Sequence, residues 1–312
     1  MGGRVSVVIP VLNREDLVTR CLDSVWAQTL RPLDVIVVDN NSTDGTLQRV
    51  ADWGDARSAF SPDSDFRLRI LTEPTPGASA ARNRGLAEVE TEYTIFFDSD
   101  DEMMPVLAES ALAAIGDADI VYWRGDVVGI DGWVTQKPFH RGDLLMRHVY
   151  NALLSTQLYM ARTSVFRDAG GWNEEAAVWN DWEIGFRILL GGPRAVALDE
   201  TLTRIHAQRE SITGTSFSGR AGEWERTLDI MVADVERSGL GPRARKRLRR
   251  MLLYRGAILA AHYRAEGDEA DADRLMDRIL DCDMIGFVRK TWLCFLHHYT
   301  ALGGRGAYYL WR

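Results

Sequence analysis

Short β-branched runs alternate with segments of helical periodicity along the first part of the chain. Residues 5–9 are almost continuously apolar, which is typical of a strand buried on both faces of a parallel sheet. Apolar residues between positions 17 and 26 recur at helical spacing, and residues 33–38 form a second apolar run that ends at Asp39. This order predicts a β-α-β unit.

The same alternation continues through the middle of the chain. The expected elements are a helix after residue 45, a strand over 68–71, a helix over 78–89, strands over 93–97, 119–128 and 195–205, a hairpin turn at 131–132 and, from about 222, helices. Strands that alternate with helices predict an α/β sheet with right-handed crossovers, whose ligands lie beyond the carboxyl ends of the strands. Pro10, Asp39 and Asp98 would then share one edge.

Composition narrows the classes of protein that the chain could represent. With 312 residues, 46% of them hydrophobic, the chain can bury one large domain and an appendage. A formal net charge of -8 argues against broad nucleic-acid binding. The three cysteines form no C-x-x-C pair, so neither a zinc ribbon nor a disulfide framework is expected, and a reducing compartment fits.

The apolar segments are too short for a signal peptide's hydrophobic region or for a spanning helix. We therefore expect a cytoplasmic protein that meets a membrane, if at all, at the surface of its inner face. The helical tail has two readings. One is a packed appendage or homo-oligomer interface, and the other is peripheral binding to an anionic bilayer through the basic segment 243–250 and the aromatic residues that follow it.

Three carboxylates, Asp98, Asp100 and Asp101, follow the fourth apolar strand directly. Like charges at this spacing repel unless a cation compensates them, so a hard divalent ion such as Mn²⁺ or Mg²⁺ is the natural partner. The alternative is a solvated acidic turn that caps a helix beginning near Met103. The position at the carboxyl end of a strand favours the metal site.

Two other segments suit a nucleotide diphosphate. Asp39, at the end of the second strand, could accept a hydrogen bond from the ring N–H of a base, although an Asx turn explains it as well. Pro10 and Asn13 have the same ambiguity, and Asn13 could cap a helix. Segment 77–85 places small residues at a helix start and Arg82 soon after, which favours diphosphate but also close helix packing.

The sequence W-N-D-W-E at 179–183 precedes an apolar helical pattern. Asp181 would be an N-cap there, and the flanking tryptophans would also suit a pocket for a sugar. After the strand over 195–205, His206 is a candidate imidazole ligand of the metal and Arg209 a candidate contact of the diphosphate.

Together these segments resemble the family 2 glycosyltransferases of the GT-A fold over about residues 4–212. The motifs, in order, are S-V-V-I-P-V-L-N, V-V-D-N-N-S-T-D-G-T, G-A-S-A-A-R-N-R-G, F-F-D-S-D-D and W-N-D-W-E. The resemblance implies a GT-A domain over 1–220, with a nucleotide-binding half (1–101) and an acceptor half (102–220), and a helical region over 221–312.

The resemblance also implies roles for individual residues. Asp39 reads the base, Asp98 touches the ribose or the metal shell, Asp100 is the principal metal ligand, and Asp181 is the general base. His206 becomes a ligand of the metal or the diphosphate. The remaining implied nucleotide-sugar contacts are Pro10, Asn13, Arg82, Asn83, Ser99 and Arg209. Asn180 departs from the family, which commonly has an acidic residue there.

The resulting hypothesis is an inverting, metal-dependent transfer of a sugar from a nucleotide diphosphate to a hydroxyl of a glycan, a lipid-linked or a small-molecule acceptor. UDP is the preferred carrier by family frequency alone. A dinucleotide-dependent dehydrogenase would need G-x-G-x-x-G and a P-loop enzyme G-x-x-x-x-G-K-[ST], and the sequence has neither. The other alternative is a non-catalytic nucleotide-sugar-binding or scaffold protein of the same fold.

Overall fold

The computed structural model describes residues 5–58, 65–208, 216–304 and 306–310. The chain forms two compact units, each built from three segments. The sheet unit contains residues 1–144, 153–174 and 191–209, and the helical unit contains residues 145–152, 175–190 and 210–312. The expected boundary at residue 220 stays a prediction.

Four parallel strands form the first part of the sheet, in the order β3-β2-β1-β4. They are β1 (Val5–Val11), β2 (Leu33–Asp39), β3 (Phe66–Thr72) and β4 (Tyr93–Phe96). The connecting helices are α1 (Val18–Trp26), α2 (Thr46–Ser58) and α3 (Ala78–Glu88). All these elements confirm the predicted pattern. The apolar runs of β1, β2 and β4 are buried almost throughout, as expected of central strands, whereas β3 lies at the edge of the sheet and is only partly buried.

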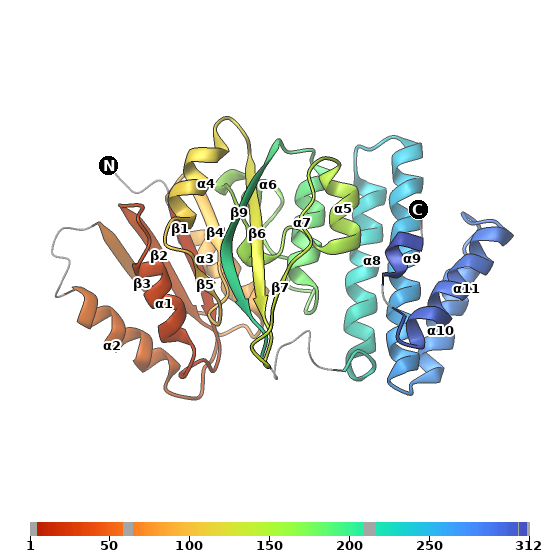
Figure 1. The fold of residues 1–312 in the computed structure, drawn as a ribbon, viewed down its shortest axis with the longest axis horizontal. Helices are drawn as coiled ribbons and strands as arrows, with labels where there is room; N and C mark the ends of the chain where they lie inside the picture. Colours follow the sequence, from red (N-terminus) through yellow and green to blue (C-terminus); the bar gives the residue numbers. More distant parts are fainter. Residues whose placement is uncertain (1–4, 59–64, 209–215, 305, 311–312) are drawn as a thin grey trace. The chain divides into compact units, whose positions relative to one another are not determined.

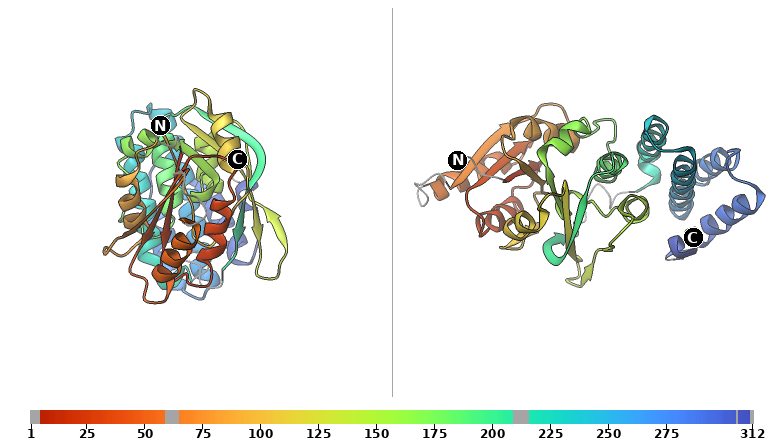
Figure 2. Two further views of the ribbon diagram at one scale, coloured as in Figure 1. Left: turned by 90° about the vertical axis from the view of Figure 1, so that its left-hand side faces the viewer. Right: turned by 90° about the horizontal axis from the view of Figure 1, so that it is seen from above.

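Helices cover both faces of these strands. Val7 and Ile9 of β1 pack in one core with Cys21 and Leu22 of α1. On the other face α3 lies so close to β1 that a Cβ added at Gly85 would overlap Cγ1 of Val8. The view from above in Figure 2 shows helices on the two sides of the strands.

The second part of the sheet mixes strand directions. Beyond β4 the order continues β8-β6-β9-β5, with β7 paired to β6, so that the described residues form nine strands. Their bounds are β5 (Glu102–Met103), β6 (Ile120–Val128), β7 (Val134–Gln136), β8 (Tyr159–Arg162) and β9 (Ala195–His206). The remaining elements here are α4 (Leu107–Ile115), η1 (Thr156–Leu158) and α6 (Thr163–Asp168). Strand β8 runs antiparallel to β4 and β6, whereas β9 runs parallel to β6. The α/β class with a mixed sheet is confirmed.

The expectation that a helix begins near Met103 is wrong. Glu102 and Met103 form β5, which pairs antiparallel with β9 through Arg204 and Thr203, and α4 begins only at Leu107. Pairing with a strand a hundred residues later overrides the local preference of the acidic turn for a helix start.

The helical unit has a core of its own. It comprises α5 (Leu144–Asn151, except its first residue), α7 (Asn180–Leu190), η2 (Ser218–Arg220), α8 (Ala221–Arg237), α9 (Pro242–Ala265), α10 (Glu269–Leu280), α11 (Phe287–Ala301) and α12 (Ala307–Leu310), coloured green to blue in Figure 1. Trp182 and Phe186 of α7 are buried with Trp224 of α8 and Leu252 of α9. The predicted helical tail is confirmed. Within the described residues no helix is both long and apolar enough to cross a bilayer.

Candidate functional site

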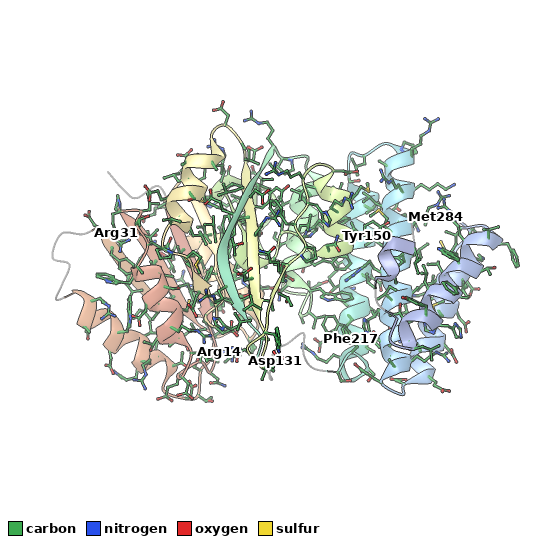
Figure 3. All side chains as sticks on the ribbon, in the orientation of Figure 1. Arg14, Arg31, Asp131, Tyr150, Phe217 and Met284 are labelled. Atoms are coloured by element: carbon green, nitrogen blue, oxygen red, sulfur yellow. The ribbon has the colours of Figure 1, made fainter. Side chains whose placement is uncertain are left out.

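The carboxyl ends of β1, β2 and β4 meet at one edge of the sheet, as predicted. Val11 pairs with Asp39, and Val8 pairs with Phe96, from which the chain continues to Asp98. Arg14, labelled in Figure 3, follows β1 at this edge. The topology therefore brings Pro10, Asp39 and the acidic segment after β4 to the same edge of the sheet unit.

Asp39 is buried at this edge with half of its carboxylate unpaired. Its side chain is 5% exposed. Oδ2 accepts a hydrogen bond from the backbone N–H of Ser42 at 3.3 Å, and buried Oδ1 has no partner among the described residues. An unsatisfied buried acceptor costs roughly 1–3 kcal/mol, and a donor from outside the chain would remove this cost.

Asn40 holds together the loops beside Asp39. The Nδ2 of Asn40 donates to the carbonyls of Glu73 and Thr75 at 2.8 and 2.7 Å, and its Oδ1 accepts from the N–H of Gly77 at 2.7 Å. Asn40 therefore joins the loop after β2 to the start of α3. The sequence did not single it out, and its only signal was an Asn-Asn doublet after a strand.

Asn13 has a positive φ of 51° and accepts a hydrogen bond on Oδ1 from the N–H of Thr43 at 2.8 Å. Its own N–H donates to Oγ of Ser42 at 3.0 Å. The expected helix cap is wrong, because α1 begins at Val18 and has Leu17 before it without a side-chain cap. Asn13 instead ties the loop after β1 to the loop after β2.

Asp98 and Arg82 form an ion pair at the start of the acidic segment. Nη2 of buried Arg82 donates to Oδ1 of Asp98 at 2.8 Å, and the guanidinium lies over the ring of Trp172 at 4.4 Å. Asp98 itself is only half-buried. Stacking on a tryptophan and the ion pair with Asp98 together fix the plane and direction of the Arg82 guanidinium. Trp172 is a further residue that the sequence did not indicate.

Asp100 carries a charge that the protein does not fully compensate. Nε of Arg14 lies 3.8 Å from Oδ2, and Nη2 of Arg20 donates to the backbone carbonyl of Asp100 at 2.5 Å. Burial, and then the negative charge of Asp98, raise the pKa of Asp100. A cation placed between Asp98 and Asp100 would relieve both effects.

Asp101 is structural. Its Oδ2 accepts from the side chain of Gln157 at 2.8 Å, and its Oδ1 accepts from the backbone N–H of His206 at 2.8 Å. Burial raises the pKa of Asp101 well above its ordinary value, and the charges of Asp98 and Asp100 add to this. Asp101 thereby fixes the end of β9 against the acidic segment.

His206 thus lies beside the acidic segment, as the sequence predicted. Its Nε2 is 2.7 Å from Oε1 of Glu102, a carboxylate that also lies 3.4 Å from Nε of Arg20. With Nε2 oriented by a carboxylate, Nδ1 is the nitrogen through which His206 would coordinate a metal.

The acidic segment suits a hard divalent cation by its chemistry. Asp98 and Asp100 offer carboxylate oxygens, and Mg²⁺ or Mn²⁺ commonly binds through one or two carboxylates and the phosphates of the substrate. Among the described residues no group of three or more His, Cys, Asp or Glu side chains is arranged to hold an ion. The two carboxylates suit an ion that takes its other ligands from a bound diphosphate.

Three further residues, Asn83, Ser99 and Arg209, were also predicted as nucleotide-sugar contacts. The amide of Asn83 accepts from the N–H of Trp172 at 2.7 Å and donates to the carbonyl of Trp172 at 2.9 Å and to Glu174 at 3.0 Å, so both of its ends hold segment 172–174 in place. Ser99 is buried between the two aspartates. Arg209 lies outside the described residues.

Asp181 lies in the first turn of α7, in the helical unit. Oδ1 accepts from the N–H of Trp182 at 2.8 Å, so the carboxylate bonds to the next residue and is not the cap before the helix. Trp182 is buried in the helical core and cannot serve as a sugar platform. Trp179, half-buried, meets it edge to face at 5.1 Å.

Two residues from other helices hold this tryptophan pair. His148 of α5 accepts the indole N–H of Trp182 on its backbone carbonyl at 3.0 Å, and its Nε2 lies 2.8 Å from the carbonyl of Trp182. The guanidinium of Arg255 lies over the rings of Trp179 and Trp182 at 5.2 and 4.8 Å. Burial lowers the pKa of Arg255. Neither residue was predicted, because neither belongs to a local motif.

A family model described as Glycosyl transferase family 2 matches residues 6–167. The curated "Glycosyltransferase GlyA" of Streptococcus pneumoniae is 36% identical over 101 residues, 32% of this chain and 13% of that protein. A "PGL/p-HBAD biosynthesis glycosyltransferase" of Mycobacterium tuberculosis is 29% identical over 188 residues, 58% of this chain and 68% of that protein. The chain therefore spans about an eighth of GlyA and two thirds of the mycobacterial protein.

Two solved structures have a similar fold. TarS 1-349 of S. aureus in complex with UDP-GlcNAc superposes with a TM-score of 0.71 at 21% identity, over 96% of this chain and 87% of that one. The mannosyltransferase PcManGT of Pyrobaculum calidifontis, in complex with GDP-Man and Mn²⁺, gives a TM-score of 0.59 at 20% identity, over 97% of this chain and 81% of that one.

Proposed function

Because the chain belongs to glycosyl transferase family 2 and has the GT-A fold, we propose that it transfers a sugar from a nucleotide diphosphate to a hydroxyl of an acceptor, with inversion and with the help of Mn²⁺ or Mg²⁺. The family and the fold support the general chemistry of this proposal. The roles of individual residues rest on the geometry of the two units.

The observation that carries the proposal is the unpaired Oδ1 of Asp39. A buried carboxylate oxygen at the carboxyl edge of the sheet suits the ring N–H of a nucleobase, which would supply the missing hydrogen bond. Uracil and guanine both carry such a donor. UDP is the preferred carrier by family frequency, and the similar structures of TarS and PcManGT were solved with UDP-GlcNAc and GDP-Man respectively.

Asp98 and Asp100 would hold the metal ion, with His206 joining through Nδ1. The ion would act as a Lewis acid that offsets negative charge on the diphosphate. Arg82, held by Asp98 and Trp172, would orient the donor from the α3 side. Pro10, Asn13 and Ser99 line the same edge, and we retain them as nucleotide contacts, whereas Asn83 would act by positioning segment 172–174.

Asp181 would be the general base that takes the proton of the acceptor hydroxyl as this oxygen attacks the anomeric carbon. Its position in the first turn of α7 supports this role. The neighbouring Trp182 is buried and makes two hydrogen bonds with His148. These contacts would hold the backbone that carries the Asp181 carboxylate in a fixed position. The acceptor could be a glycan, a lipid-linked sugar or a small molecule.

The test is metal-dependent release of nucleotide. The full chain is incubated with UDP-, GDP- and dTDP-sugars and a panel of acceptors, with Mn²⁺, with Mg²⁺ or with a chelator, and free nucleotide is measured. We expect acceptor-dependent release with one class of donor and its loss with the chelator. A donor that raises the unfolding temperature without release under any condition would favour the non-catalytic binding protein instead.

Asp181→Asn gives the sharpest test of the catalytic base. We expect turnover to fall by roughly 100-fold or more, with donor affinity nearly unchanged, because the base acts only in the chemical step. Asn180→Asp is the matched control, since it alters the neighbouring residue and should retain turnover within about tenfold of wild type. Full turnover in Asp181→Asn would refute the assignment.

A further inference from the structure

Helix α11 of the helical unit has an exposed apolar face. Phe287 and Val288, in its first turn, are 83% and 79% exposed, and Trp292 and Phe295 are 40% and 47% exposed. Side chains of this size are rarely left in water together on a folded protein, and a cluster of them usually marks a surface that another body covers.

The exposed residues lie on the side of α11 that faces away from the core. Positions 288, 292 and 295 share one helix face, and the buried Leu293 and Leu296 lie on the neighbouring side that faces the core. Trp292 and Phe295 stack at 5.0 Å, and the indole N–H of Trp292 donates to the carbonyl of Leu310 at 2.8 Å. Phe287 and Val288 are the most exposed part of this face within α11.

The same end of the helical unit is strongly basic. Arg250 of α9 donates to the carbonyl of Met284, just before α11, at 3.5 Å, and Arg264 donates to His297 at 3.0 Å further along both helices. Helices α9 and α11 therefore run in the same direction, and α11 begins beside the third turn of α9 (Met284 is labelled in Figure 3). The cations near the two helix starts are Arg243, Arg245, Lys246, Arg247, Arg249, Arg250, Arg289 and Lys290.

The acidic residues near these helix starts are fewer. Glu236 pairs with Arg249 at 2.9 Å, and Asp281 and Asp283 lie in the turn before α11. Three acids against eight cations leave an excess of positive charge over the first turns of α9 and α11. This excess contrasts with the net charge of -8 of the whole chain.

We propose that this end of the helical unit docks on an anionic lipid bilayer, with Phe287 and Val288 entering the headgroup region and the cations contacting lipid phosphates. Apolar side chains surrounded by lysine and arginine are the pattern that binds anionic membrane surfaces. A second copy of the chain, packed with the same end against this one, would place two groups of cations together, so charge favours lipid over a parallel self-contact. The proposal concerns binding and holds whether or not the chain transfers sugar.

The test is co-sedimentation of the full chain with vesicles of phosphatidylcholine alone and of phosphatidylcholine mixed with phosphatidylglycerol. We expect binding to the anionic vesicles that weakens as salt rises. Arg243→Gln and Lys246→Gln, both at exposed positions, should each weaken partitioning about fivefold. The double change of Phe287 and Val288 to serine should weaken it at least about tenfold.

Leu302→Ser is the matched control. Leu302 is 89% exposed and apolar, but it follows the opposite end of α11, so its loss should leave vesicle binding unchanged. Unchanged unfolding temperatures would show that the variants are folded. Absence of binding to anionic vesicles at low salt overturns the proposal. So does equal binding to neutral vesicles, or a concentration-dependent dimer that the double serine variant abolishes while vesicle binding is absent.

Discussion

The aspartates at the carboxyl edge of the sheet differ in role because their surroundings differ. Asp101 has both oxygens bonded within the chain, and Asp98 is paired with Arg82. Asp39 keeps one buried oxygen unpaired, and Asp100 has its pKa raised by burial and by Asp98. Of these four, Asp39 lacks a hydrogen-bond donor and Asp100 carries a charge that burial disfavours. A nucleotide would supply the donor, and a cation would stabilise the charge.

Asp39→Asn should separate affinity from stability. Removing a buried, half-paired charge is expected to leave the ligand-free protein at least as stable as wild type, because the desolvation cost of the carboxylate disappears. The same change should weaken nucleotide binding about tenfold, since a charge-assisted hydrogen bond becomes a neutral one. Calorimetric titration with nucleotide and thermal unfolding without it measure the two effects. Lower stability with unchanged affinity would contradict the nucleotide role.

Among individual residues, the sequence predicted those at the carboxyl ends of strands, such as Asp39 and Asp98, because their place in the chain is enough to bring them to one edge of the sheet. It could not indicate Asn40, Trp172 or Arg255, whose roles depend on contacts made after folding. It also assigned caps wrongly at Asn13, since an asparagine can satisfy a neighbouring loop as readily as a helix end.

At the scale of elements, the predictions held where a local pattern was clear. Strands β1 to β4 were found from their apolar runs, and helix α3 from its alanine-rich sequence. The helix near Met103 failed because β5 forms only by pairing with β9, far along the chain, and no local pattern encodes that partner. A two-residue strand also lacks a period that sequence could reveal.

Gly85→Ala tests the close packing of α3 on β1. The added methyl would overlap Val8, so we expect a loss of about 1–3 kcal/mol in the free energy of unfolding, measured by urea titration. Gly222→Ala is the control, because it lies in the first turn of α8 with open space around it and should be neutral or slightly stabilising. Equal effects of the two changes would show that packing at Gly85 is not tight.

The buried contact between His148 of α5 and Trp182 of α7 should make the stability of the protein depend on pH. Burial lowers the pKa of His148 to about 4, so the folded protein binds fewer protons at this site than the unfolded chain between pH 6.5 and 4. Its contribution is fully present above pH 6.5 and is lost as pH falls toward 4, by up to about 3 kcal/mol.

His148→Gln removes this titration. The difference in unfolding free energy between wild type and variant, measured in urea, should therefore shrink as pH is lowered from 7 toward 4. A difference that stays constant over this range would mean that His148 keeps an ordinary pKa in the folded protein.

At the scale of the whole molecule, both compact units are discontinuous in sequence. The core of the helical unit includes Val149 of α5, Val178 just before α7, and Trp182 and Phe186 of α7, together with the tail. Sequence patterns predict helices in the tail correctly, but they do not show that segments 145–152 and 175–190 pack with it, because that assignment follows from long-range contacts alone.

Truncation after residue 208 tests this arrangement. The shortened chain would retain α7 but lose α8 and α9, which bury Trp182 and Phe186 in the helical core. We expect poor recovery of folded protein, binding of a hydrophobic dye and a lower unfolding temperature than that of the full chain. A truncated protein that unfolds cooperatively at the temperature of the full chain would show that residues 1–208 fold independently.

The division of both units into three segments also bears on how related chains can be recombined. Asp181 belongs to the helical unit, whereas the aspartates after β2 and β4 belong to the sheet unit. A chimera that exchanged only the last hundred or so residues between two relatives would pair a foreign tail with the resident α5 and α7. Hybrids with new acceptor preferences would therefore have to inherit three separate segments from the same parent.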